Sequence, residues 1–155
     1  MITRINLTAA LLSFVFLGAG CDLYGPTVAT EFQATLTGGA ERPDPVETDA
    51  MGTGTFSLNA DETQLSYSIS ASGFSEDVIA AHFHFSADGA DGSGGIVFGI
   101  TDSVVNDGNG GVTAEGTWDL TAEDVLNLRL DYIYVNLHTE ANPAGEIRGN
   151  LIPAS

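Results

Sequence analysis

Lysine is missing from the 155-residue sequence, and its four basic residues are all arginines. Against them stand 21 aspartate and glutamate residues, which give a formal net charge of −17. Such an acidic surface repels the phosphates of nucleic acids and of anionic lipids, so the sequence excludes nucleic acid as a partner. The acids are scattered, and we interpret them mainly as a solubilising surface; attraction of cations or basic proteins is the alternative.

Cysteine is nearly absent as well, because Cys21 is the only one in the chain. A single cysteine excludes an intramolecular disulfide bond. The sequence also contains neither a Gly-x-Ser-x-Gly motif nor a glycine-rich phosphate-binding loop. It therefore shows no machinery for nucleophilic catalysis.

The N-terminal segment lacks an apolar run long enough to span a bilayer comfortably. It has one cation, Arg4, an uncharged stretch over residues 5–20, and three small residues directly before Cys21. This arrangement is typical of an export signal and resembles the lipobox of bacterial lipoproteins. The resemblance predicts a signal peptide over residues 1–20, a lipidated Cys21, and a tether over residues 21–29. We therefore expect lipid anchoring to a membrane of the cell envelope, on the extracytoplasmic side, in the periplasm or at the cell surface.

Beyond residue 30, apolar and polar residues alternate in short segments that glycine, aspartate and asparagine separate. Alternation of this kind is typical of β-strands with one buried face. We expect about eight strands, near residues 32–36, 56–58, 65–71, 78–85, 95–100, 112–118, 130–138 and 146–152. Their number and spacing predict one all-β domain over residues 30–152, either an antiparallel β-sandwich or a Greek-key barrel.

One short helix is expected between the sixth and seventh strands. Thr121 is a suitable N-cap, and acidic residues follow it in the first turn, where the helix dipole favours them. Val125, Leu126 and Leu128 are predicted to pack the apolar side of this helix against the sheet.

The three histidines of the chain all fall in two predicted strands. His82 and His84 are separated by one residue, so a strand places both side chains on one face and Phe83 on the other. His138 lies in a later predicted strand, on the same face as Asn136. If the two strands are neighbours, three imidazoles converge, and imidazole is a good ligand for copper, zinc or nickel. The alternative is a structural role, with the histidines hydrogen-bonded to the backbone or to acids.

Two other groups of polar residues are weaker candidates. Residues 88–92 contain two aspartates but lack the spacing and the closing glutamate of an EF-hand loop, so we interpret them as a turn. Glu146 and Arg148 lie two apart on one strand face, and we expect each to pair with neighbours or with the other. Neither group predicts a site of its own.

Several motifs of the chain resemble the chordin-type (CHRD) domain family. They lie in residues 32–43, 52–56, 82–84, 134–139 and 142–149. The last of these, Asn-Pro-Ala-Gly-Glu-Ile-Arg-Gly, is the most specific. The resemblance spans about residues 30–152 and implies an immunoglobulin-like β-sandwich. It predicts the architecture of the domain but not a reaction that the domain catalyses.

The triplet His82-Phe83-His84 is also similar to the strand-borne copper ligands of copper/zinc superoxide dismutases, and His138 is similar to their later copper ligand. The chain has no further histidine for their bridging position and no cysteine pair. This resemblance implies a copper or zinc site at His82, His84 and His138 without dismutase activity. Two functions stay open: a non-enzymatic binding or structural module with a protein partner, and a metal-binding protein. A hydrolase would need paired carboxylates in a cleft.

Overall fold

The computed structural model describes residues 28–155. Cys21 and the predicted signal peptide lie outside the described residues. Within residues 28–155, no helix is both long and apolar enough to cross a membrane. The structure therefore describes the predicted domain and residues 28–29 at the end of the predicted tether.

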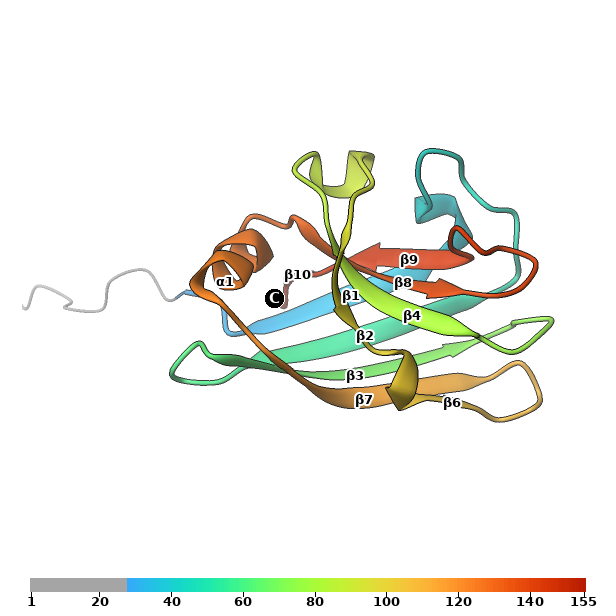
Figure 1. The fold of residues 1–155 in the computed structure, drawn as a ribbon, viewed down its shortest axis with the longest axis horizontal. Coiled ribbons are helices and arrows are strands. Elements are labelled where there is room, and N and C mark those ends of the chain that lie inside the picture. Colours follow the sequence, from blue (N-terminus) through green and yellow to red (C-terminus); the bar gives the residue numbers. More distant parts are fainter. Residues whose placement is uncertain (1–27) are drawn as a thin grey trace, which may run out of the picture.

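Strands dominate the described chain, and one α-helix interrupts them (Figure 1). The strands are β1 (Glu31–Thr37), β2 (Met51–Leu58), β3 (Gln64–Ser72), β4 (Ala80–Phe85), β5 (Ile96–Gly99), β6 (Val104–Asn106), β7 (Val112–Asp119), β8 (Ile133–His138), β9 (Ile147–Asn150) and β10 (Ile152–Pro153). The helix is α1 (Ala122–Arg129), and three single 3₁₀ turns are η1 (Gly38–Ala40), η2 (Gly89–Asp91) and η3 (Thr101–Ser103). Their pairings are antiparallel, so the predicted all-β class is confirmed.

The described chain contains ten strands, where the sequence predicts about eight. One additional strand is β6, whose three residues are too few to show an alternating pattern. The other arises because the last predicted strand divides at Leu151. Leu151 is buried and donates its amide hydrogen to the carbonyl of Ile133, while β9 pairs with β8 and β10 pairs with β1.

All these strands belong to one sheet that curls back on itself. Its order is β5-β4-β8-β9-β1-β2-β3-β7-β6, with β10 beside β1. Phe83 of β4 demonstrates the closure, because its ring centroid lies 5.9 Å from Phe56 in β2 and 5.5 Å from Tyr67 in β3. The Trp118 ring of β7 stacks on the same ring at 5.3 Å. The two halves of the sheet therefore enclose one core, in a sandwich-like or barrel-like arrangement (Figure 1).

β3 shows how the alternating pattern builds this core. Leu65, Tyr67, Ile69 and Ala71 are buried, and the serines between them are exposed. Removing a large aliphatic side chain from water contributes about 1.5 to 3 kcal/mol, so a strand with this pattern stays in register only when its apolar face meets the core. The strand predicted over residues 65–71 is confirmed.

Helix α1 begins as the sequence predicts. The Thr121 hydroxyl accepts a hydrogen bond from the Asp124 amide at 3.2 Å, and the Asp124 carboxylate accepts one from the Thr121 amide at 2.8 Å. Val125 and Leu128 are buried, but Leu126 is 57% exposed, so the prediction that Leu126 packs on the sheet is wrong. Residues three apart share a helix face, and Leu126 lies on a different side from that pair.

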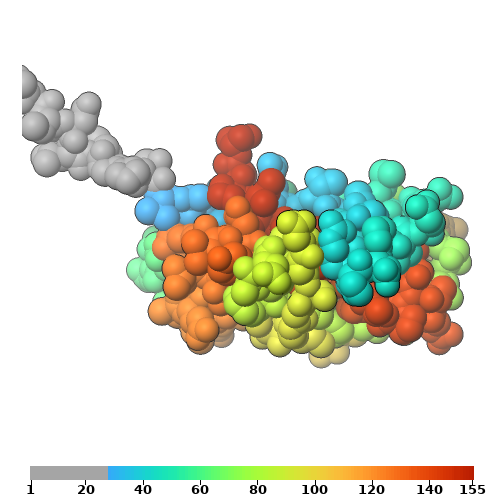
Figure 2. All heavy atoms as spheres, turned by 90° about the horizontal axis from the view of Figure 1, so that it is seen from above, coloured from blue at the N-terminus to red at the C-terminus, as the bar shows by residue number. Residues whose placement is uncertain are grey.

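The outer face of β4, β8 and β9 is covered by loops rather than exposed to solvent. The loops of residues 38–50, 86–95 and 139–146 lie side by side across this face (Figure 2). As a result β8 is buried over its whole length, because the core covers one face and these loops cover the other. Polar side chains on this outer face therefore lie in a sheltered layer.

Candidate metal centre

The three histidines meet on the outer face of two neighbouring strands. β4 and β8 pair antiparallel, with His82 opposite Asn136 and Ala80 opposite His138. This register makes His138 a diagonal neighbour of His82, on the face away from the buried Phe83. One nitrogen of each imidazole lies within 4.8 Å of the corresponding nitrogens of the other two. The sequence alone could not supply this convergence, because it depends on the pairing of β4 with β8.

Backbone carbonyls hold two of the rings in one tautomer. The Nδ1 of His84 lies 3.0 Å from the carbonyl oxygen of Gly94, and the Nδ1 of His138 lies 3.1 Å from that of Pro143. A carbonyl oxygen can only accept a hydrogen bond, so both Nδ1 atoms bear hydrogens and both Nε2 atoms have free lone pairs. Metal-binding histidines are commonly oriented in this way by a second hydrogen bond.

The free nitrogens of these rings face the cluster. The Nε2 of His84 is buried and has no hydrogen-bond partner among the described residues. The Nε2 of His138 lies 3.1 Å from the Nδ1 of His82, which therefore donates the hydrogen between them. If His82 carried its hydrogen on Nε2 instead of Nδ1, a metal ion between the rings would meet three lone pairs: Nδ1 of His82, Nε2 of His84 and Nε2 of His138.

Burial keeps all three imidazoles neutral near pH 7. Desolvation is the main cause that lowers the pKa of His82 and of His84, and for His84 the charges of His82 and Arg148 add to it. Burial also lowers the pKa of His138 to about 4, while its hydrogen bond to Pro143 acts in the opposite direction. Neutral imidazole is the form that binds metal ions, so no proton has to be removed at physiological pH.

The spacing of the nitrogens is close to that of a metal site. Nitrogens that share one ion at about 2.1 Å lie roughly 3.4 to 3.6 Å apart in tetrahedral or trigonal geometry. The His82–His138 pair, at 3.1 Å, is slightly closer than this, and no pair in the cluster is more than 4.8 Å apart. Shifts of about 1 Å in the ring positions would complete the geometry.

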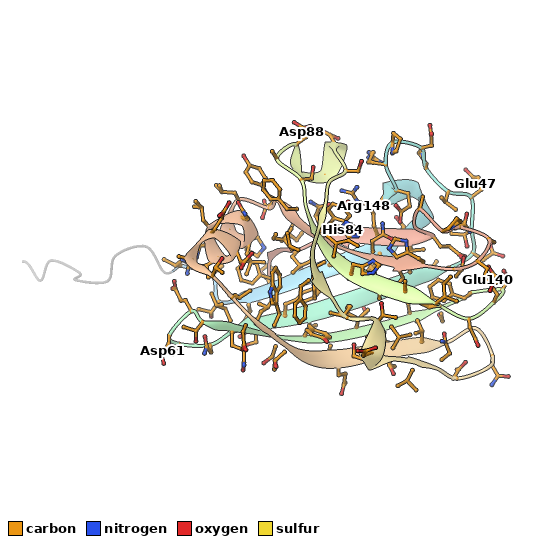
Figure 3. All side chains as sticks on the ribbon, viewed as in Figure 1. Glu47, Asp61, His84, Asp88, Glu140 and Arg148 are labelled. Atoms are coloured by element: carbon orange, nitrogen blue, oxygen red, sulfur yellow. The ribbon has the colours of Figure 1, made fainter. Side chains whose placement is uncertain are left out.

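Tyr134 and Arg148 support His84 from the side of β9. The rings of His84 and Tyr134 stack at 4.8 Å with an interplanar angle of 6°, and the Arg148 Cζ lies 3.7 Å from the Tyr134 centroid. Arg148 also donates hydrogen bonds to the carbonyls of Gly92 and Gly89. Figure 3 shows His84 and Arg148 next to each other beneath the loop of η2. The arginine thus connects the covering loop to the cluster.

Glu41 forms a second buried polar group in the same layer. Asn136 donates a hydrogen bond from Nδ2 to the Glu41 Oε2 at 3.3 Å. Burial raises the pKa of Glu41 to about 7, although the charges of Arg148 and Arg42 and the Asn136 hydrogen bond lower it. Within residues 28–155, the Glu41 Oε1 and the Asn136 Oδ1 have no hydrogen-bond partner, and both lie beside Gly145. A proton on Glu41 provides the hydrogen that these two acceptor oxygens lack.

Sequence reasoning did not find the roles of Glu41 and Arg148. Glu41 lies in a segment that looks like a polar loop, and only its place in the CHRD motif marks it. Arg148 was expected to pair with neighbours or with Glu146, and the two residues bind different neighbours. Glu146 accepts hydrogen bonds from the hydroxyls of Thr48 and Thr139 at 2.7 and 2.6 Å.

A hollow beside α1 does not offer the paired carboxylates that a hydrolase needs. This hollow, of about 410 Å³, lies beside α1 and includes Asp61 and Glu62 in its lining. Arg129 donates two hydrogen bonds to Glu62, at 2.7 and 3.1 Å, and these lower the Glu62 pKa. A general acid needs a raised pKa, so this hollow does not suit acid–base catalysis.

The fold and the buried outer layer together define an all-β domain of the sandwich or barrel type. The model of the CHRD domain family matches residues 32–151, so the chain belongs to that family and the resemblance seen in the sequence is confirmed. No curated protein and no solved structure matches the chain. At the level of the family, the protein is a non-enzymatic module.

Proposed function

We propose that this CHRD-domain protein is a metal-binding module held at the cell envelope by lipid on Cys21. In this proposal His82, His84 and His138 bind one copper or zinc ion on the extracytoplasmic side of the membrane. The module holds the ion without catalysing a reaction. The histidine cluster supports the first part, and the lipobox-like segment before Cys21 supports the second.

The observation that carries the metal proposal is the free Nε2 of His84. This atom is buried, its lone pair is available because Nδ1 donates to Gly94, and it has no partner among the described residues. Leaving a buried acceptor without a partner costs about 1 to 3 kcal/mol, and a bound ion would remove that cost. A purely structural histidine in this position would be expected to use both ring nitrogens.

The donor set indicates the class of metal. Three imidazoles suit copper, zinc or nickel, whereas calcium and magnesium prefer oxygen ligands. The cluster contains no carboxylate. It also lacks the fourth histidine that a superoxide dismutase uses as a bridge, since His82, His84 and His138 are all the histidines of the chain. Copper and zinc are therefore the ions to test.

The proposal is tested by titrating the full-length protein with Zn(II) and with copper in a calorimeter. We expect one tight site per chain, and its loss when alanine replaces all three histidines. Because the chain is strongly acidic, weak binding to surface carboxylates must be separated from the site. Glu115→Gln, an exposed change on β7, is a matched control that should leave the tight site intact. Tight binding that persists without the histidines contradicts the proposal.

The anchor is tested separately. Cys21→Ser removes the thiol that would accept the lipid, and we expect the chain to move from the membrane fraction to the soluble fraction. Incorporation of labelled palmitate should disappear in the same variant. Equal membrane association of the two proteins would refute the lipid anchor and leave the metal site unaffected.

A further inference from the structure

Arg148 is a buried cation without an acidic partner in the described chain. It is 1% exposed, and its hydrogen bonds go to neutral oxygens: the carbonyls of Gly89 and Gly92 and the side-chain oxygen of Asn150. The ion pair found within residues 28–155 joins Arg129 to Glu62 instead. A buried charge is costly when no opposite charge lies against it, so this arrangement needs an explanation.

The positive charge of Arg148 acts on the histidine cluster. Since β8 lies between β4 and β9, Tyr134 has His84 on one side and Arg148 on the other. The register also places His82, Asn136 and Arg148 in one row across the three strands. The Tyr134 ring therefore connects the guanidinium of Arg148 to the His84 imidazole through two aromatic contacts.

Neither of the two buried acids, Glu41 and Glu146, forms a hydrogen bond with Arg148. Glu41 has a pKa of about 7, so it is largely neutral in slightly acidic solution. Glu146 directs its carboxylate to the hydroxyls of Thr48 and Thr139. Arg42 adds positive charge, since it lowers the Arg148 pKa. An ion at the cluster would therefore have three neutral imidazole ligands, and the charge that lies against the opposite face of Tyr134 from His84 is the positive charge of Arg148.

We propose that this site selects a monovalent ion, Cu(I), over the divalent Zn(II). This inference rests on the proposed metal site and states which ion that site prefers. Each added unit of charge on the ion is repelled by Arg148, and no anionic ligand offsets that repulsion. A unit charge roughly 8 to 10 Å away, in an effective dielectric of about 20, changes the affinity for another unit charge by roughly twentyfold.

The test compares Cu(I) and Zn(II) dissociation constants for the full-length protein at pH 6.5. Cu(I) is measured anaerobically by competition with bicinchoninate, and Zn(II) by competition with a chromophoric chelator. The variants are Arg148→Gln, which removes the charge, and Arg148→Lys, which keeps it. The matched control is Arg129→Gln, which removes an arginine charge from α1, where Arg129 pairs with Glu62 and not with the histidine cluster.

We expect Cu(I) to displace Zn(II) from the wild-type site. R148Q should raise the Zn(II) affinity about twentyfold more than the Cu(I) affinity, whereas R148K and R129Q should keep the wild-type ratio of the two affinities. If wild-type protein keeps Zn(II) when equimolar Cu(I) is added, the inference is overturned even if R148Q does not fold. A ratio of Cu(I) to Zn(II) affinity that is unchanged in folded R148Q overturns the inference as well. Failure of both ions to bind would instead refute the proposed function.

Discussion

Replacing Glu41 tests the physics of the buried polar layer independently of any metal. In the folded protein burial raises the pKa of Glu41 from 4.5 to about 7, against the opposing charges of Arg148 and Arg42. Glu41→Gln substitutes a neutral amide of nearly the same shape as the protonated acid. Its amide group can donate to the Asn136 Oδ1 and accept from the Asn136 Nδ2, so the pairing with Asn136 can be kept.

The sign of the effect follows from proton linkage. Because the pKa of Glu41 is raised in the folded state, its contribution to stability is fully present below pH 4.5 and is lost as the pH rises through about 7. Each pH unit in this window changes the free energy of unfolding by about 1.4 kcal/mol. Between pH 5 and pH 8, the wild type should therefore lose roughly 2 to 3 kcal/mol relative to Glu41→Gln.

The three histidines change the stability with pH in the opposite direction, so their contribution has to cancel in the comparison. The pKa values of His82, His84 and His138 are lowered by burial, so their contribution is present above pH 6.5 and is lost at lower pH. Both proteins contain these residues, and their effect cancels in the difference between wild type and Glu41→Gln. The difference in unfolding free energy is thus the quantity to plot.

The assay is urea unfolding of wild type and Glu41→Gln at pH 5, 6, 7 and 8. The variant should match the wild type at pH 5 and become the more stable protein at pH 8. Glu47→Gln, which lies on the exposed side of the same loop, changes the charge equally and should give a constant difference. If the difference in unfolding free energy between wild type and Glu41→Gln is also constant with pH, the claim that a neutral Glu41 is buried is refuted.

Other substitutions test the packing and the site. Gly145 has φ of +136°, and a Cβ there would lie 2.5 Å from the Asn136 amide, so Gly145→Ala should cost about 1 to 3 kcal/mol in thermal unfolding, whereas Gly39→Ala, where a Cβ meets nothing within 4 Å, should not. Phe83→Ala should lower the free energy of unfolding by about 3 to 5 kcal/mol in urea, because Phe83 joins both halves of the core. Zinc affinity, measured by chelator competition, should keep falling towards pH 4, where His138 becomes protonated; an affinity that stops falling well above pH 4 would contradict the lowered pKa of His138.

Local patterns made much of the fold predictable. The alternation over residues 65–71 predicts β3 because a two-residue period has one physical explanation, a strand with one buried face. The Thr121 cap predicts the start of α1 for a similar local reason. The same reasoning failed for Leu126 and did not find β6, since short elements give too few residues to define a face.

The candidate site was only partly accessible from the sequence. The His82-x-His84 spacing fixes two imidazoles on one face of β4, whatever the partner strand is. The position of His138 depends on the pairing of β4 with β8, which no local pattern specifies. Glu41 and Arg148 look like ordinary surface residues, and their burial follows from loops that fold over the sheet. Their effect on the site is a tertiary property.

The most direct test of the central claim is X-ray absorption spectroscopy of the zinc-loaded protein. The claim is that His82, His84 and His138 bind one ion through three imidazole nitrogens. The account predicts three nitrogen ligands at about 2.0 to 2.1 Å, with the outer scattering typical of imidazole, and loss of this signal when the three histidines are replaced by alanine. A first shell of oxygens alone, unchanged by the replacement, would contradict it.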